Sequence, residues 1–278
     1  MTPRQLIRQT AERFRLSGIP DPENDAALLL AHLTGKSALT LRLDMDTDLD
    51  SSIIAAHEEL VLRRLERQPL QYILGEAPFC TRLFKVDSRV LIPRPETELL
   101  CEWALDLISG ISSPRVLDLC CGSGCLGLTL KAERADAAVT LSDLSEDALN
   151  VTAVNAVRLS LDVAVCQSDL FSNLTGAAFD LIVSNPPYIP SDLCDSLQPE
   201  VLREPRLALD GGDDGCDLYR RIIDAAPAFL APGGRLLMEL GIGEADYLAD
   251  LLDDAGWKNI ETRKDYAGID RMILAIKP

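Results

Sequence analysis

The sequence has few of the residues from which metal sites are usually built. Only two of its 278 residues are histidines, His32 and His57, and its eight cysteines include no Cys-x-x-Cys pair. A structural zinc site normally takes four such ligands at short spacings, and a disulfide framework needs a regular cysteine pattern. We therefore expect no metal site and no disulfides, and we expect both histidines to be non-catalytic residues of helices.

Positive charge is also scarce. The chain carries 27 Lys and Arg against 44 Asp and Glu, a formal net charge of −17. Binding to a nucleic-acid backbone is driven by Lys and Arg that neutralise phosphates. The balance therefore argues against nucleic acid as the main partner. The acidic excess would suit a basic protein surface, or it would simply keep the protein soluble.

Long apolar runs are missing as well. No stretch reaches the roughly 18 apolar residues of a membrane span. The first residues carry Arg4 and Arg8 without the apolar segment of a signal peptide. We expect a protein of the reducing cytoplasm. With 47% hydrophobic residues, the chain can still bury a sizeable core. Its length allows one or two domains, and we expect two.

The most informative stretch is an apolar run, Asp180–Ser184, that ends in Asn185, Pro186, Pro187 and Tyr188. The run predicts a buried strand, and the two prolines end it because they cannot donate ladder hydrogen bonds. Each proline also restricts the residue before it. Asn185 would then present its carboxamide oxygen as an acceptor, with the Pro186 carbonyl as a second acceptor nearby.

Two such acceptors suit a planar amino group, which is a poor nucleophile because its lone pair is delocalised. Hydrogen bonds from both N–H groups to Asn185 and Pro186 would direct the lone pair outward, and Tyr188 would stack on the planar group. We therefore predict catalytic roles for Asn185, Pro186 and Tyr188, and substrate contacts from these three and Pro187. The alternative is a stiff turn after a strand.

A second motif lies upstream, where Val116–Leu119 predicts a strand followed by a turn and a helix from near Ser123 to about Arg134. Gly122 and Gly124 would let the backbone approach a ligand, and the helix start would offer free N–H groups. Cys120 stands where a dinucleotide-binding turn has its first glycine, so a smaller nucleoside ligand is favoured over a pyrophosphate. The predicted cofactor-binding residues of this turn are Cys120, Cys121, Gly122, Ser123 and Gly124.

Acidic residues follow the next two predicted strands. Asp143 ends the strand Ala138–Asp143 and lies 21 positions after Gly122, where a carboxylate binds the hydroxyls of a ribose. It could instead only cap a helix that begins near Ser145. Asp169 ends a third strand, Val163–Leu170, and would accept from an adenine amino group, with Leu170 as an apolar wall. Four strands thus end in ligand-type residues.

These motifs resemble class I S-adenosylmethionine-dependent methyltransferases, with the glycine motif at Asp118–Gly124, the ribose acid at Asp143 and the amino-methylating signature at Asn185–Tyr188. Within that class the whole chain is similar to the release factor glutamine methyltransferases, also called PrmC or HemK. The further matching segments are Pro69–Gly75, Ile92–Glu98, Glu204–Gly212 and Ala267–Arg271.

The resemblance implies methyl transfer from S-adenosyl-L-methionine to the side-chain amide nitrogen of the glutamine in the Gly-Gly-Gln motif of peptide chain release factors, with S-adenosyl-L-homocysteine as product. It also implies that the segment around Pro93–Pro95 helps to cover the cofactor pocket. Alternative substrates are a ribosomal-protein glutamine and an exocyclic amino group of an extruded nucleic-acid base. A binding module without catalysis is the remaining alternative.

The predicted architecture follows from these assignments. Residues 1–74 read as a helical, substrate-docking domain, residues 75–94 as a β-hairpin linker, and residues 95–278 as a Rossmann-like methyltransferase domain with a doubly wound sheet. Its last strand is expected to be antiparallel, and the protein is expected to be a monomer.

Several elements of the later chain can be placed in advance. The expected elements are a strand over Arg89–Ile92, a helix over Thr97–Ser109, a substrate-facing loop over Ile189–Asp214, a helix over Cys216–Leu230, a turn at Pro232–Gly234, a strand over Arg235–Leu240, a helix over Glu244–Ala255, and final strands over Lys258–Thr262 and Arg271–Ile276.

Overall fold

The computed structural model describes residues 1–176 and 178–278. The chain forms two compact units. One consists of Met1–Gly75 together with Gln198–Arg203, and the other of Glu76–Leu197 together with Glu204–Pro278. Over the described residues, no helix combines the length and the hydropathy that crossing a lipid bilayer requires.

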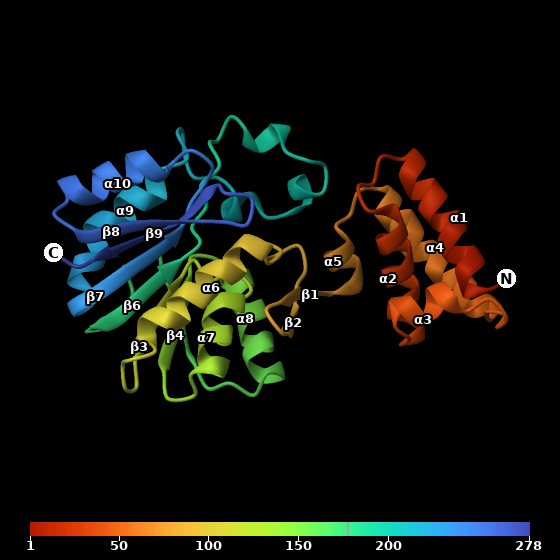
Figure 1. Ribbon diagram of the computed structural model, residues 1–278, viewed down its shortest axis with the longest axis horizontal. Coiled ribbons are helices and arrows are strands. Elements are labelled where there is room, and N and C mark those ends of the chain that lie inside the picture. Colours follow the sequence, from red (N-terminus) through yellow and green to blue (C-terminus); the bar gives the residue numbers. More distant parts are fainter. Residues whose placement is uncertain (177) are drawn as a thin grey trace. The chain divides into compact units, whose positions relative to one another are not determined.

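The first unit is helical, as its sequence predicts (Figure 1). Its helices are α1 (Pro3–Leu16), α2 (Pro22–Thr34), α3 (Ala38–Leu43), α4 (Ser51–Leu65) and α5 (Leu70–Leu74). Phe14, Leu30, Leu41 and Val61 are fully buried in its core. His32 lies on α2 and His57 on α4, as expected.

An ion cluster attaches the segment Gln198–Arg203 to the helices of this unit. The buried Arg64 guanidinium lies 2.8 Å from a carboxylate oxygen of Asp25 and 2.8 Å from one of Glu200, and Arg67 lies 2.7 Å from the other Glu200 oxygen. A buried charge without a partner is costly, so removal of any one of these side chains would destabilise the cluster. No local pattern in the sequence predicts that this part of the long loop belongs to the helical unit.

The second unit begins with the antiparallel hairpin of β1 (Glu76–Phe79) and β2 (Arg82–Lys85). The strand predicted at Arg89–Ile92 is wrong, because this segment pairs with no strand among the described residues. Its backbone is held differently: the Ile92 N–H donates to the Glu204 carboxylate at 3.0 Å.

In the part of the chain that the structure describes, the main sheet has seven strands in the order β5-β4-β3-β6-β7-β9-β8. Their bounds are β3 (Arg115–Leu119), β4 (Ala138–Asp143), β5 (Ala164–Gln167), β6 (Phe179–Ser184), β7 (Leu230–Glu239), β8 (Lys258–Lys264) and β9 (Asp270–Ile276). The strands β3 to β7 are parallel, whereas β9 is antiparallel to β7 and β8. The predicted doubly wound sheet with an antiparallel last strand is confirmed.

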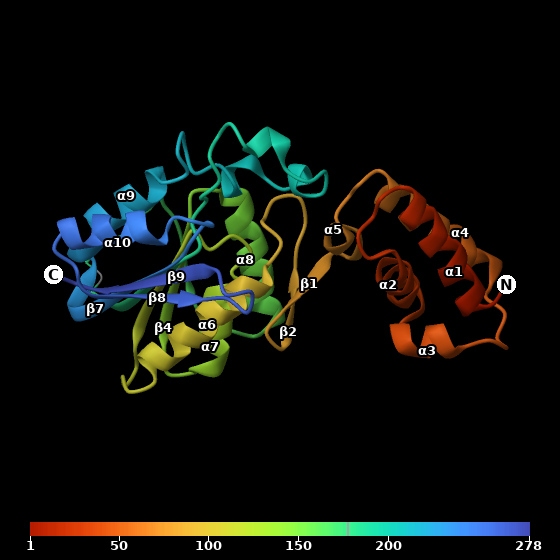
Figure 2. The same ribbon diagram turned by 45° about the horizontal axis from the view of Figure 1, so that its top comes forward.

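Helices cover both faces of this sheet (Figures 1 and 2). One face packs against α6 (Pro95–Ile108), α7 (Cys125–Glu133) and α8 (Glu146–Arg158), and the other against α9 (Asp217–Ala225) and α10 (Ala245–Asp254). Neighbouring residues of one strand therefore enter different cores, because side chains alternate across a sheet. Leu181 and Val183 belong to the first core, and Ile182 to the second.

Two predicted boundaries near β7 are wrong for local reasons. The expected turn at Pro232–Gly234 lies inside β7, where the pairing steps from Phe179 opposite Leu230 to Leu181 opposite Arg235. These residues form an irregularity within the strand and not a turn before it. The preceding helix ends at Ala225 instead of Leu230, because Pro227 lacks the N–H that would continue it.

Candidate active site

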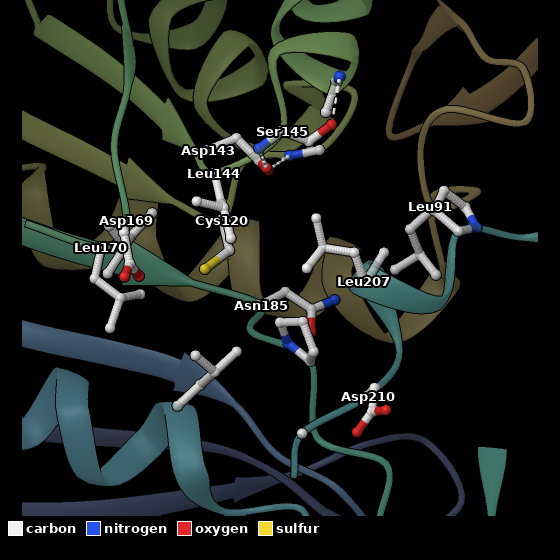
Figure 3. Close-up of a pocket in the computed structure, with 18 of the residues that line it drawn as sticks. Leu91, Cys120, Asp143, Leu144, Ser145, Asp169, Leu170, Asn185, Leu207 and Asp210 are labelled. Atoms are coloured by element: carbon white, nitrogen blue, oxygen red, sulfur yellow. Dashed lines mark hydrogen bonds between the residues drawn. The ribbon is translucent and has the colours of Figure 1, made fainter. Parts of the chain in front are cut away.

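A cavity of about 660 Å³ lies at the carboxyl edge of the parallel strands. Cys120 follows β3, Asp143 ends β4, Asp169 follows β5 and Asn185 follows β6, and all four residues line this cavity (Figure 3). The strand order reverses between β3 and β6, where an open α/β sheet leaves a crevice for ligands. The structure thus brings together the four strand ends that the sequence singled out.

The glycine turn has three residues of positive φ: Cys120 at 61°, Gly122 at 54° and Gly124 at 77°. This conformation is rare for residues with a Cβ atom. It explains why dinucleotide-binding turns have a glycine at the position that Cys120 occupies here. Helix α7 begins at Cys125, two residues after the predicted start. A Cβ atom on Gly124 would lie 2.9 Å from the Thr152 side chain, so the turn is closely covered by α8.

Two side chains of α8 hold this turn, and sequence reasoning missed both. The Thr152 hydroxyl donates to the Gly122 carbonyl at 2.8 Å, and the Asn155 side-chain amide donates to the Ser123 carbonyl at 2.9 Å. Because both carbonyls accept hydrogen bonds from α8, the backbone of the turn is held in one conformation. The signal available in the sequence was the spacing of Thr152 and Asn155, two polar residues one turn apart on an otherwise apolar face of the helix.

Asp143 ties the glycine turn to the start of α8, whose N-cap is Ser145 itself. One carboxylate oxygen accepts from the Gly122 N–H and the other from the Ser145 N–H, each at 2.9 Å. Burial raises the pKa of Asp143, and these backbone hydrogen bonds oppose that shift. A carboxylate has about four acceptor positions, so ligand hydroxyls can still bind beside the two backbone donors.

Asp169 and Leu170 lie where the third strand has already ended. The strand stops at Gln167, and Leu170 takes a positive φ of 49°, which turns the chain into the cavity wall. Leu170 is buried, whereas Asp169 is exposed and forms an ion pair of 2.7 Å with Arg221 of α9. Both line the cavity.

The Asn185 side chain is anchored by its nitrogen. Its Nδ2 lies 3.2 Å from the hydroxyl oxygen of Thr97, in the first turn of α6. The preceding Ser184 hydroxyl donates to the Leu119 carbonyl at 2.7 Å, which ties the end of β6 to β3. With the nitrogen engaged by Thr97, the carboxamide oxygen is the polar atom left for a ligand.

The other residues of the motif occupy different positions. Pro187 lines the cavity and Pro186 is buried. Tyr188 is half-buried against the core beneath α9 and does not line this cavity. Cys121 and Ser123 line a small void of about 40 Å³ that also touches Asn185.

The loop after the motif, predicted to face the substrate over Ile189–Asp214, returns to the cavity wall. The Gly211 N–H donates to the Ile189 carbonyl at 2.8 Å, and the Ile189 N–H donates to the Leu209 carbonyl at 2.9 Å. Leu207 approaches the cavity beside Asn185 (Figure 3). The loop therefore contributes an apolar part of the wall.

Glu204 connects this loop to the segment before α6. Its carboxylate accepts from the Ile92 N–H at 3.0 Å and from the Arg94 guanidinium at 2.5 Å, and it is buried. Leu91 lies in the cavity wall, and Arg94 lines the small void. The segment that the resemblance assigned to covering the pocket is thus held through two hydrogen bonds by one residue distant in sequence, Glu204.

Asp118 lies beneath the turn. It is 1% exposed, and its carboxylate accepts from the Gly127 N–H at 2.8 Å. Burial raises its pKa to about 7, and the nearby charge of Asp143 adds to the shift. Since the side chain is enclosed behind the turn, its role is to hold the start of α7.

The sheet order and the cavity at its switch point define the class I methyltransferase fold. Solved structures agree. The catalytic domain of hMettl16 in complex with an RNA hairpin superposes with a TM-score of 0.59 at 14% identity, covering 88% of this chain and 90% of that one. A methyltransferase from Pyrococcus furiosus gives 0.52 at 15% identity, covering 70% and 88%. At these identities the likeness concerns the fold.

Comparison of the sequence with known proteins identifies the family within this class. Residues 5–75 match the PrmC N-terminal domain, and residues 96–209 match the methyltransferase small domain. The release factor glutamine methyltransferase of Deinococcus radiodurans is 40% identical over 272 residues, covering 98% of this chain and 97% of the relative. That of Cereibacter sphaeroides is 41% identical, covering 98% and 97%. The chain belongs to the release factor glutamine methyltransferase family and is a methyltransferase.

Proposed function

We propose that the protein transfers a methyl group from S-adenosyl-L-methionine to the side-chain amide nitrogen of the glutamine in the Gly-Gly-Gln motif of peptide chain release factors, as a monomer in the cytoplasm. The names of its relatives support this substrate. The observation that carries the chemistry is the anchored Asn185 side chain, whose nitrogen binds Thr97 and whose oxygen is left for a ligand.

The cavity suits S-adenosyl-L-methionine in size and chemistry. Its volume of about 660 Å³ is within the range of small-molecule sites. Asp143 would bind the ribose hydroxyls, the turn around Gly122 would contact the amino-acid part, and Asp169 with Leu170 would hold the adenine. A fold neighbour, the T. thermophilus 16S rRNA methyltransferase RsmC, was solved with AdoMet and guanosine. When bound, the donor supplies a methyl group activated by its sulfonium charge.

The protein's own contribution is to position the nucleophile. The Asn185 oxygen and the Pro186 carbonyl would accept the two N–H groups of the substrate amide, so that its lone pair faces the donor. Pro187, which lines the cavity, would limit the rotation of the planar amide. No strong base is required, and positioning of this kind is worth roughly 7 to 11 kcal/mol of the barrier.

The helical unit is proposed to dock the protein substrate. A groove on this unit is lined by four arginines and two glutamates together with apolar residues: Arg4, Arg8, Arg15, Arg42, Glu12, Glu23, Ile7 and Ala11 among them. This is a local positive excess on a chain of net charge −17. It suits an acidic segment of the substrate protein, because opposite charges steer association and fix register.

The proposal is tested by methyl incorporation from labelled donor into three separate substrates: release factor, a ribosomal protein with a comparable glutamine, and nucleic acid. We expect label in the release factor and none in a factor whose Gly-Gly-Gln glutamine is replaced by alanine. Label that persists in that factor, or that appears in nucleic acid at a higher rate, would contradict the proposed substrate.

A further inference from the structure

The anchor of Asn185 does not end at Thr97. The Thr97 hydroxyl donates to a carboxylate oxygen of Glu239, the last residue of β7, at 2.6 Å. Thr97 is 4% and Glu239 2% exposed. Three residues from β6, α6 and β7 therefore form a continuous chain of hydrogen bonds from the cavity into the interior.

The direction of this chain is fixed by the number of hydrogens available. A threonine hydroxyl has one hydrogen, and a carboxylate can only accept. The Thr97 hydrogen thus goes to Glu239, and the hydroxyl oxygen can only accept from Asn185. That requirement turns the carboxamide nitrogen toward Thr97 and its oxygen toward the ligand side. Without the carboxylate, nothing in this chain distinguishes the two orientations of the amide.

We propose that Glu239, acting through the Thr97 hydroxyl and through its own hydrogen bond with Asn185, fixes the orientation of the Asn185 carboxamide so that its oxygen receives an N–H of the substrate amide. Glu239 and Thr97 are positioning residues, since neither is among the residues that line the cavity of about 660 Å³. A hydrogen bond to a charged group is stronger than a neutral one, and chains of hydrogen bonds polarise one another. The Asn185 oxygen is consequently a better acceptor as well as a correctly placed one.

The groups around Glu239 make this arrangement sensitive to pH. Burial raises the pKa of Glu239 to about 7, and Glu96 of α6 adds to the shift, while hydrogen bonds from Thr97 and Asn185 and the charge of Arg271 on β9 oppose it. The charge of Glu239 contributes to raising the pKa of two tyrosines, Tyr188 after β6 and Tyr219 on α9. The Tyr219 hydroxyl also donates to the Glu239 backbone carbonyl at 2.8 Å. Protonation of Glu239 would free the Thr97 hydrogen and release the constraint on Asn185.

This inference rests on the proposed function, but its test includes a readout that needs no substrate. The side-chain NH₂ resonances of Asn185, assigned by their loss in Asn185→Ala, are followed from pH 5 to 9 in wild type and Glu239→Gln. We expect a titration with a midpoint near pH 7 in wild type and none in Glu239→Gln. Resonances that do not titrate in wild type, or that titrate equally in Glu239→Gln, would overturn the proposal even if methylation of release factor is confirmed.

Kinetics supply the second arm. Thr97→Val should lower the single-turnover rate about tenfold, the equivalent of one lost hydrogen bond, while donor affinity by calorimetry stays within about twofold. Thr97→Ser, which keeps the hydroxyl, should restore the rate. Substitution of Thr262, an exposed threonine of β8, by valine serves as the control.

A Thr97→Val enzyme with the wild-type rate, or a serine variant as slow as the valine variant, would overturn the role of the hydroxyl. An inactive wild type on release factor would instead contradict the proposed function alone.

Discussion

Gly211 lies so close to Tyr188 that a Cβ atom on Gly211 would stand 2.8 Å from the Tyr188 Cα. The same loop approaches Tyr188 again at Gly215, where a Cβ atom would lie 2.4 Å from the Tyr188 carbonyl oxygen. Such contacts are shorter than van der Waals separations and are possible only for glycine. The loop that follows the Asn-Pro-Pro-Tyr motif therefore fixes the backbone of the motif's last residue.

Gly211→Ala should displace Tyr188 and lower turnover at least tenfold. The backbone on both sides must shift to admit the methyl group, which also costs about 1 to 3 kcal/mol of stability. Turnover and thermal unfolding are compared with Gly110→Ala, where no atom lies within 4 Å of the added Cβ. Equal activity of the two variants would remove the loop from any role in shaping the motif.

Asp143→Ala should weaken donor binding more than it lowers the rate at saturating donor. The carboxylate would be lost as a ligand, and the Gly122 and Ser145 N–H groups would lose their acceptor. Calorimetric titration measures the affinity. Asp136→Ala is the matched control, because Asp136 also accepts a backbone N–H, from Ser113, but is exposed and is not among the residues lining the cavity. A donor affinity equal to that of the control would contradict the ribose-binding role.

Asp118 should make folding stability depend on pH. Its pKa is raised from an ordinary 3.8 to about 7, so the folded state binds a proton that the unfolded state has already released between these values. Stability should then fall as pH rises from about 4 to 7, by on the order of 4 kcal/mol for this group. Denaturant unfolding should show a flatter profile for Asp118→Asn. The same slope in both proteins would show that Asp118 does not carry this effect.

Arg8→Glu should raise the KM for intact release factor and leave the KM for a short Gly-Gly-Gln peptide unchanged. Arg8 is exposed and lines the groove of the helical unit, and reversal of its charge repels an acidic partner. Lys36→Glu makes the same charge change on an exposed residue of the helical unit that does not line the groove. Similar KM values for both variants would argue against docking in this groove.

The residues at the strand ends could be predicted because their signals are local. A strand that must stop at Pro186, or that ends in Asp143, is visible within a few residues of sequence. The direction of the last strand could be predicted because Lys258–Thr262 and Arg271–Ile276 follow each other with no helix between them. Other short signals were misleading, because pairing within the sheet decided the outcome: Pro232–Gly234 lies inside β7 as an irregularity, and Arg89–Ile92 is not a strand.

The supporting contacts could not be predicted, because they join segments far apart in sequence. Thr97 lies 88 residues from Asn185 and 142 from Glu239. Likewise, Glu204 lies 112 residues from Ile92. Nothing in the sequence near Glu239 marks it as more than a polar residue at the end of a strand. Only the folded chain brings these residues together.

The most direct test of the account is the single-turnover rate of Asn185→Ala with release factor, measured alongside donor affinity. If the carboxamide oxygen holds the substrate amide, the rate should fall about 10²- to 10³-fold, as for loss of one preorganised polar contact, while donor affinity stays within about twofold. A variant that methylates release factor at the wild-type rate would contradict the central role of Asn185.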